Sequence, residues 1–292
     1  MGTQAQSRGA QNPWFGRRTA DGSPTLLHLG LDEACHSDVG AWTEAREVYV
    51  RATRLPERVE AGELSRCRIL DVGTGLGWNL TAALHALAGS GCPVDVVALE
   101  SDPRVFEAAA ELARDMDVPT GLRDAVDLWR RTLSVLIDAA ANPGASVPVS
   151  AGAGRLRLLV GDGARCLPAL CRAQPDLAFD AVFLDPFSPK IAPALWEHAF
   201  LDVLARCMAP SSILATYSAA SRVRLGFALA GLEVGRGPGI GNKSESTVAS
   251  PDQSLPPLPP RAARNLERAL VEHAAKSAHD RRVAGGGGVE GA

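Results

Sequence analysis

A glycine-rich segment at residues 71–79, with the sequence DVGTGLGWN, carries the first residue types suited to chemistry. It follows an apolar run and opens an amphipathic one, so we predict a strand-to-helix turn whose glycines let a ligand approach the backbone. A dinucleotide-binding turn needs glycine where Trp78 stands, and Asp71 would repel a pyrophosphate. A carboxylate suits a cation instead, and S-adenosylmethionine carries an ammonium and a sulfonium without phosphate. The segment therefore predicts S-adenosylmethionine as cofactor, bound by Asp71, Gly73, Thr74, Gly75, Gly77 and Asn79.

Two later positions extend this predicted cofactor site. Glu100 ends the next apolar run, where an acid accepts hydrogen bonds from ribose hydroxyls. Asp162 and Gly163 follow a third apolar run. An aspartate there can accept a hydrogen bond from an adenine amino group, and it can also cap the helix that follows. Both roles of Asp162 stay open at this point.

The loop LDPFSPK at residues 184–190 places an acid, an aromatic ring and a cation after a fourth apolar run. Ligands of open α/β sheets bind beyond the carboxyl ends of the strands, so we expect this loop beside the methyl donor. An amine acceptor must be neutral, which costs up to about 4.6 kcal/mol at pH 7 for a lysine-like amine. Asp185 is suited to take that proton and Phe187 to pack on the acceptor, with Lys190 as a third candidate catalytic residue.

Short apolar runs alternate with amphipathic segments through most of the chain. We predict strands at 68–72, 94–99, 155–160, 178–184, 212–217 and 232–235, and helices near 77–89, 103–115, 122–139, 163–173, 193–207 and 219–230. Strands that are apolar on both faces and separated by helices indicate an α/β fold with a doubly wound, mostly parallel, Rossmann-like sheet. Residues 23–37 are expected to add a small N-terminal β-hairpin.

The same patterns suggest a domain division. Residues 1–22 are predicted to be a flexible N-terminal arm, 23–249 the catalytic domain, and 250–292 a Pro-rich linker with a flexible or marginally helical tail. The chain of 292 residues has a net charge of -3, which speaks against indiscriminate binding of nucleic acid.

Targeting and metal signals are weak by comparison. No apolar run is long enough to span a bilayer and no secretory signal is recognisable, so we expect a cytoplasmic protein with no membrane partner. The six cysteines have no metal-ligand spacing, so we expect free thiols and no metal site.

Three segments together resemble the MnmC-like methyltransferase family, which belongs to the class I S-adenosylmethionine-dependent methyltransferases. They are GAWTEAREVYV at 40–50, LDPFSPKIAPALW at 184–196, and TYSAASRVRLGFALAGLEVGRGPGIGNKSE at 216–245, within a match over roughly 20–247. The resemblance implies the class I fold and methylation of an aminomethyl group on a modified wobble uridine of tRNA. It also implies a stand-alone form without the FAD-dependent oxidase domain, so that a separate oxidase or modification enzyme supplies the aminomethyl precursor.

The resemblance also assigns residues. Asp185 matches the acid of the family's active-site loop, and Glu44 and Tyr217 are added as catalytic candidates. Arg224, Lys243 and His36 become candidate substrate-binding residues, although the stretch at 239–245 keeps only one of the family's several basic residues. Candidate phosphate contacts elsewhere are Arg17, Arg18, Arg51, Arg54, Arg58, Arg222 and Lys190.

Other functions remain open on these observations. The acidic balance and the thinned basic stretch favour a small-molecule amine methyltransferase or an aminopropyltransferase on the same fold. A cofactor-binding protein without catalysis is disfavoured by the acids at 71, 100, 162 and 185, and a nicotinamide oxidoreductase by Trp78 and Asp71.

Overall fold

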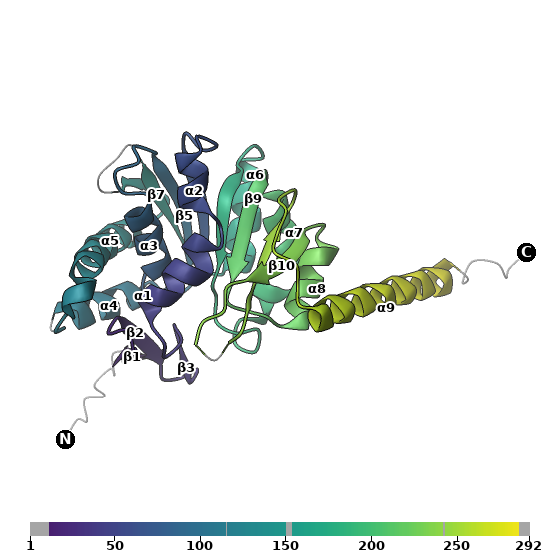
Figure 1. Cartoon of the computed structure of the whole chain (residues 1–292), viewed down its shortest axis with the longest axis horizontal. Coiled ribbons are helices and arrows are strands. Elements are labelled where there is room, and N and C mark those ends of the chain that lie inside the picture. Colours follow the sequence, from purple (N-terminus) through teal and green to yellow (C-terminus); the bar gives the residue numbers. More distant parts are fainter. Residues whose placement is uncertain (1–11, 115, 150–153, 242, 286–292) are drawn as a thin grey trace, which may run out of the picture.

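A central eight-stranded sheet organises the computed structural model, which describes residues 12–114, 116–149, 154–241 and 243–285. The strand order is β10-β11-β9-β8-β4-β5-β7-β6 (Figure 1). The strands are β4 (Cys67–Val72), β5 (Val94–Glu100), β6 (Ser146–Pro148), β7 (Arg155–Val160), β8 (Phe179–Leu184), β9 (Met208–Thr216), β10 (Glu233–Gly237) and β11 (Ser246–Ser250). Neighbours from β9 to β7 in this order run parallel, so the predicted mostly parallel α/β sheet is confirmed.

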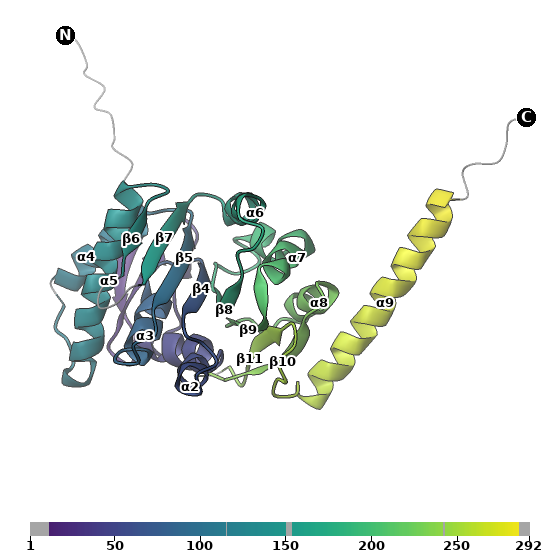
Figure 2. The same cartoon turned by 90° about the horizontal axis from the view of Figure 1, so that it is seen from above.

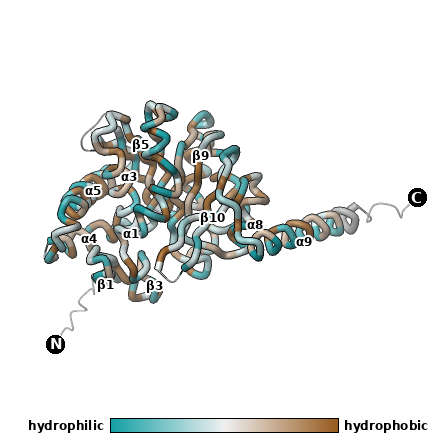
Figure 3. Tube along the Cα trace, in the orientation of Figure 1, coloured by the Kyte–Doolittle hydropathy of each residue, from teal (hydrophilic) through white to brown (hydrophobic). Residues whose placement is uncertain are grey.

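Helices cover both faces of the sheet. One face carries α1 (Ala41–Glu44), η1 (Ala45–Arg51), α2 (Leu55–Glu60), α3 (Trp78–Ala86), α4 (Arg104–Arg114), η2 (Thr120–Leu122) and α5 (Arg123–Ala141). The other carries α6 (Gly163–Ala173), η3 (Pro193–Trp196), α7 (His198–Arg206) and α8 (Ser221–Leu229), as Figure 2 shows from above. Each layer has its own buried apolar cluster, and hydrophobic residues gather in the central strands (Figure 3). This burial on both faces explains the continuous apolar runs of the strands.

Strand β11 was missed by the sequence analysis. Its sequence STVAS lacks an apolar run, yet all five residues are buried between β9 and β10. The hydroxyl groups of Thr247 and Ser250 donate hydrogen bonds to the backbone carbonyls of Ser218 and Ser212, both at 2.6 Å. Burial of this polar strand is possible because these hydroxyls find backbone acceptors.

A separate three-stranded sheet lies at the start of the described chain. It consists of β1 (Trp14–Arg18), β2 (Pro24–His28) and β3 (Glu33–Ala34), all antiparallel. The predicted hairpin at 23–37 is therefore confirmed as β2–β3. Strand β1 lies within residues 1–22, which the sequence analysis assigned to a flexible arm. This part of the segment forms a strand because it pairs along the whole of β2.

Two cysteines correct the expectation of free thiols. Cys171 in α6 and Cys207, which follows α7, form a disulfide. Helices α6 and α7 pack side by side, which brings the two side chains together. The remaining cysteines, at positions 35, 67, 92 and 166, are free.

After the last strand the chain forms a long helix, α9 (Pro260–Gly285). Its first part packs on α8 and the rest projects away from the body of the molecule (Figures 1 and 2). Within the described parts of the chain, no helix is long and apolar enough to cross a membrane.

Candidate active site

A cavity of about 480 Å³ lies where the parallel strands end at their carboxyl termini. Its floor includes the residues that follow β4, β5, β7, β8 and β9, and its roof comes from residues 14–38 of the N-terminal sheet and the segment after it. The sequence-predicted residues that line it are Arg17, Glu44, Gly73, Gly75, Glu100, Gly163, Asp185, Phe187, Tyr217, Lys243 and His36. Asp71, Thr74, Gly77, Asn79, Asp162, Lys190 and Arg224 lie outside the lining.

The glycine segment forms a tight turn between β4 and α3. Gly73, Gly75 and Gly77 have φ angles of +82°, +51° and +76°, a region that L residues with a side chain rarely adopt. A Cβ atom on Gly73 would lie 2.6 Å from the backbone oxygen of Asp185. Glycine is therefore required at position 73, both for the backbone conformation and for close packing against the loop after β8.

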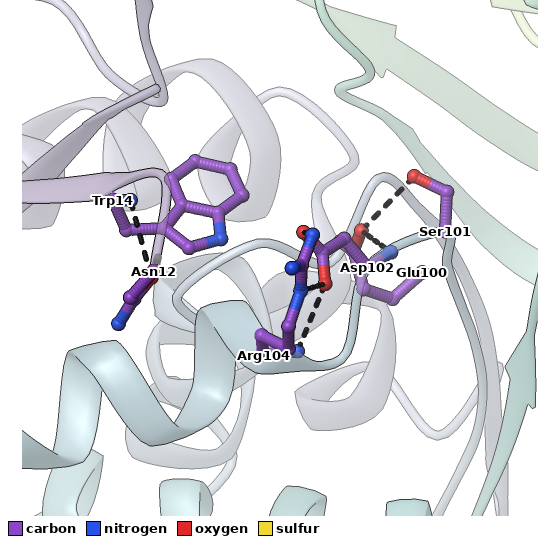
Figure 4. Close-up of polar contacts among 6 residues, drawn as sticks. All are labelled: Asn12, Trp14, Glu100, Ser101, Asp102 and Arg104. Carbon is purple, nitrogen blue, oxygen red and sulfur yellow. Dashed lines mark hydrogen bonds and ion pairs between the residues drawn. The ribbon is translucent and has the colours of Figure 1, made fainter. Parts of the chain in front are cut away.

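Glu100 sits at the end of β5 and faces this turn. Its carboxylate accepts hydrogen bonds from the backbone N–H groups of Gly75 and Asp102, both at 2.9 Å, and from the hydroxyl of Ser101 at 3.3 Å. Figure 4 shows this corner, with Asp102 also bound by Arg104. Burial raises the pKa of Glu100, while these hydrogen bonds oppose the shift. The geometry fixes the Glu100 carboxylate at the cavity wall.

Asp71 lies beneath the turn and is fully buried. Neither of its carboxylate oxygens has a hydrogen-bond partner among the described residues, and burial raises its pKa to about 7. A buried, unpaired carboxylate is costly unless a cation compensates it. Together with the side-chain-free cradle at Gly73 and Gly75, this acid fits a cationic nucleoside donor such as S-adenosylmethionine.

Asp162 takes the helix-capping role. Its carboxylate accepts a hydrogen bond from the backbone N–H of Ala164 at 3.0 Å, and it is exposed at the start of α6. The adjacent Gly163 lines the cavity, and a Cβ atom there would lie 3.1 Å from the Leu195 side chain. The adenine contact predicted for Asp162 stays a prediction.

Asp185 follows β8 directly and lines the cavity. The side-chain amide of Asn79 donates a hydrogen bond to its carboxylate at 2.8 Å. Burial, reinforced by the negative charge of Glu44, raises the pKa of Asp185 well above its ordinary value. Asn79, predicted as a cofactor contact, is thus placed to orient Asp185.

Tyr49 is a site residue that the sequence analysis missed. It is fully buried in η1, and its hydroxyl lies beside the Asp185 carboxylate without a hydrogen bond of ordinary geometry in the described structure. Helix η1 has π-helical geometry, which often marks functional sites. The signal available in the sequence was one tyrosine within the segment 40–50.

The loop after β8 is held rigidly at its backbone. The N–H of Asp185 donates to the carbonyl of Val72 at 2.9 Å. The hydroxyl of Tyr217 donates to the carbonyl of Pro186 at 3.1 Å, and the indole of Trp196 donates to that of Phe187 at 2.9 Å. Tyr217 therefore acts on the loop as well as lining the cavity.

The roof contributes further polar groups. Glu44 is buried and accepts a hydrogen bond from the backbone N–H of Ser37 at 2.9 Å. Nδ1 of His36 pairs with the hydroxyl of Thr25 at 2.9 Å, and burial lowers the pKa of His36 to about 4, so this ring is neutral at physiological pH. The ammonium of Lys243 lies 4.8 Å from the centre of the Tyr217 ring.

Arg224 is placed away from the cavity. Its guanidinium is buried, pairs with the Glu245 carboxylate at 3.2 Å and donates to the hydroxyl of Thr247 at 3.1 Å. These contacts attach α8 to β11 and the segment before it. The substrate contact predicted for Arg224 has no support in this arrangement.

Two basic positions from the sequence analysis also lie elsewhere. Arg58 is buried and donates a hydrogen bond to the backbone carbonyl of Asp180 at 2.8 Å. Asp180 lies near the start of β8, at the end of the strands opposite the cavity. Lys190 is exposed at the end of the loop. Among the described residues, no group of three or more His, Cys, Asp or Glu side chains is placed to hold a metal ion.

Comparison with known proteins agrees with this geometry. A family model described as S-adenosyl-L-methionine-dependent methyltransferase matches residues 127–252. The crystal structure of MnmC2 from Aquifex aeolicus superimposes with a TM-score of 0.69 at 29% identity, over 87% of this chain and 75% of that one. The chain belongs to the S-adenosyl-L-methionine-dependent methyltransferase family.

Relatives of this methyltransferase include larger proteins. The tRNA 5-methylaminomethyl-2-thiouridine biosynthesis bifunctional protein MnmC of Stutzerimonas stutzeri is 32% identical over 77% of this chain and 33% of its own length. The protein of the same name from Methylibium petroleiphilum is 33% identical over 78% of this chain and 33% of its own length. The chain thus spans about a third of the length of these relatives.

Proposed function

We propose that this methyltransferase methylates an amine nitrogen, the aminomethyl group of a modified wobble uridine in tRNA. The observation that carries the proposal is Asp185, an acid of raised pKa on a rigid loop that lines the cavity. A raised carboxylate pKa lies closer to that of an amine, so the proton transfer that frees the amine becomes less unfavourable. The relatives take part in biosynthesis of 5-methylaminomethyl-2-thiouridine in tRNA, as their names state, and this supports a tRNA acceptor.

Different residues of the cavity bind the methyl donor and accept the proton. S-adenosylmethionine, when bound, supplies a methyl group on a positively charged sulfur. In this proposal Gly73, Gly75 and Glu100, which line the cavity, bind the donor, and the buried Asp71 supplies the compensating negative charge. Asp185 receives the proton from the acceptor nitrogen, and Asn79 keeps the Asp185 carboxylate in place.

Positioning is the second contribution of the protein. Holding donor and acceptor in line can be worth about 7–11 kcal/mol of the barrier. The hydrogen bonds to the backbone of the loop after β8 and the roof formed by the N-terminal sheet support this positioning.

The wider setting follows from the proposed substrate. A tRNA acceptor places the enzyme in the cytoplasm, and a separate oxidase or modification enzyme supplies the aminomethyl group. We further propose residues 23–249 as the catalytic domain, with residues 250–292 as an appended linker and tail.

A small cationic amine is the competing acceptor, because five carboxylates line the cavity: Glu33, Asp38, Glu44, Glu100 and Asp185. Asp38 is paired with Arg17 at 3.1 Å. Glu33 and Glu100, however, already accept hydrogen bonds from the protein itself. Few free acids thus remain for a polyamine, which favours the tRNA acceptor.

The test is transfer of labelled methyl from S-adenosylmethionine to tRNA that lacks the final wobble methyl group, beside a panel of small amines. We expect label in tRNA, and a loss of about 100-fold or more in Asp185→Asn with unchanged donor affinity. Glu57→Gln, an exposed acid in α2, serves as the control with wild-type turnover. Label in small amines alone, or in no acceptor, would show the proposal to be wrong.

A further inference from the structure

Three aromatic rings gather at the cavity: Phe187, expected from the sequence to pack on the acceptor, and Trp14 and His28, which have had no role so far. Trp14 and Phe187 both line the cavity, with ring centres 6.2 Å apart and planes only 15° from parallel. The ring of His28 meets Trp14 edge-on at 4.8 Å and Phe187 edge-on at 6.4 Å. The rings of Trp14 and Phe187 are therefore near-parallel neighbours in the cavity lining, and the His28 ring meets both of them edge-on.

The chain fixes the orientation of this group. Trp14 stands opposite His28 in the pairing of β1 with β2. Nδ1 of His28 accepts a hydrogen bond from the backbone N–H of Leu31 at 3.1 Å, which holds the ring in place. Phe187 is held by the hydrogen bond between its carbonyl and Trp196. Both members of the near-parallel pair are thus positioned before any ligand arrives.

We propose that Trp14 and Phe187 form a stacking platform for the nucleobase that carries the acceptor amine. This rests on the proposed function and deepens it. The flat face of a nucleobase stacks well on aromatic side chains, and the gain does not depend on base identity. Phe187 follows Asp185 by two residues, so one short rigid segment contacts both the base and its amine.

A different role for Trp14 has to be separated from this one. Its indole N–H is buried without a partner of ordinary geometry in the described structure, and it lies on the side of Asp102, near Glu100 (Figure 4). A ring there could instead cover the bound donor. The two roles differ in which ligand loses affinity when the ring is removed.

The experiment measures two affinities in parallel. One is the Kd of an anticodon stem-loop RNA bearing 5-aminomethyl-2-thiouridine, in the presence of S-adenosylhomocysteine. The other is the Kd of S-adenosylmethionine by calorimetry. For Trp14→Ala we expect an about 10- to 100-fold weaker RNA Kd with donor Kd within about 2-fold of wild type, and for Trp14→Phe recovery of most RNA affinity.

The matched control is Phe15→Ala, the next residue of β1, which is 57% exposed and does not line the cavity. We expect wild-type RNA and donor affinities for it. Unchanged RNA affinity in Trp14→Ala would overturn the platform. A donor Kd that rises instead would overturn it in favour of a donor cover.

Failure of the proposed function gives a different result. Wild-type protein that binds the stem-loop through Trp14 but transfers no methyl would refute the proposed function and leave the platform standing. Wild-type protein that methylates tRNA while Trp14→Ala binds the stem-loop normally would refute the platform alone.

Discussion

Glu33 accepts two hydrogen bonds from Ser188, one from the backbone N–H at 2.7 Å and one from the hydroxyl at 2.6 Å. Glu33 belongs to β3 of the N-terminal sheet, and Ser188 to the loop that carries Asp185. The roof of the cavity is therefore attached directly to its catalytic floor.

Removing this attachment tests Glu33 as a positioning residue. For Glu33→Ala we expect kcat to fall about 10- to 100-fold, because a small misplacement of the loop misaligns acceptor and donor. Glu33→Gln keeps an acceptor oxygen and should retain most of the activity. Steady-state kinetics with tRNA would show the effect in kcat more than in the donor KM. A wild-type kcat in Glu33→Ala would contradict the role.

Gly73→Ala tests the close approach of two loops. The added Cβ would meet the Asp185 backbone oxygen at 2.6 Å, so the loop must shift and methyl transfer should fall by about 100-fold or more. Gly89→Ala is the matched control, since its φ of +79° is equally strained but nothing lies within 4 Å. We expect Gly89→Ala to cost about 1–2 kcal/mol of stability with activity intact. Equal losses in both variants would mean that backbone strain alone is responsible.

Asp71 predicts a pH dependence of stability in the ligand-free protein. Its pKa rises from 3.8 when exposed to about 7 in the fold, because burial disfavours the charged form. The favourable contribution is fully present below about pH 4 and is lost as pH rises through about 7, by on the order of 4 kcal/mol. Asp71→Asn should therefore unfold in urea at the same concentration as wild type near pH 4 and at a higher one at pH 8.

Two further results bear on Asp71. Donor affinity of wild type should increase as pH rises through about 7, since the ionised carboxylate then compensates the cation. In Asp71→Asn this dependence should flatten. Parallel pH profiles of stability for both proteins would rule out the raised pKa.

Arg224→Met separates a buried structural role from the substrate contact predicted from sequence. Loss of the guanidinium leaves Glu245 and the Thr247 hydroxyl without their partner, at a cost of about 2–4 kcal/mol in the free energy of unfolding. The exposed neighbour Arg222→Met should change it by less than about 0.5 kcal/mol. At temperatures below the unfolding transition of Arg224→Met, we expect its KM for tRNA to equal that of the wild type. A raised KM without loss of stability would restore the substrate contact.

The parallel strands and the glycine turn were predictable from the sequence. Buried parallel strands carry continuous apolar residues, and the turn after β4 needs glycines, so β4 and Gly73 left clear local signals. Strand β11 left none, because the hydroxyls of Thr247 and Ser250 are satisfied by backbone carbonyls that the sequence does not place.

Side-chain contacts between distant segments could not be predicted either. Asn79 was predicted as a cofactor contact, and its hydrogen bond to Asp185 was not foreseen. Tyr49, whose hydroxyl lies beside the same carboxylate, was not singled out at all. Trp14 lay in the segment predicted to be a flexible arm, and the pairing of β1 with β2 determines its position. Each of these relationships depends on tertiary packing, which propensity and spacing do not encode.

The N-terminal sheet has a consequence for how the protein folds. Glu33 and Ser188, whose hydrogen bonds close the cavity, lie 155 positions apart along the chain, whereas the strand pairs β4–β5 and β8–β9 of the main sheet join segments that are close in sequence. Contacts with long loops between them pay a larger entropic cost and form later. We therefore expect the pairs β4–β5 and β8–β9 to form first and the binding site to be completed in the last stage of folding. The protein would then bind the donor only once folding is complete. The bound donor would stabilise the N-terminal sheet, the part of the chain that opens most easily.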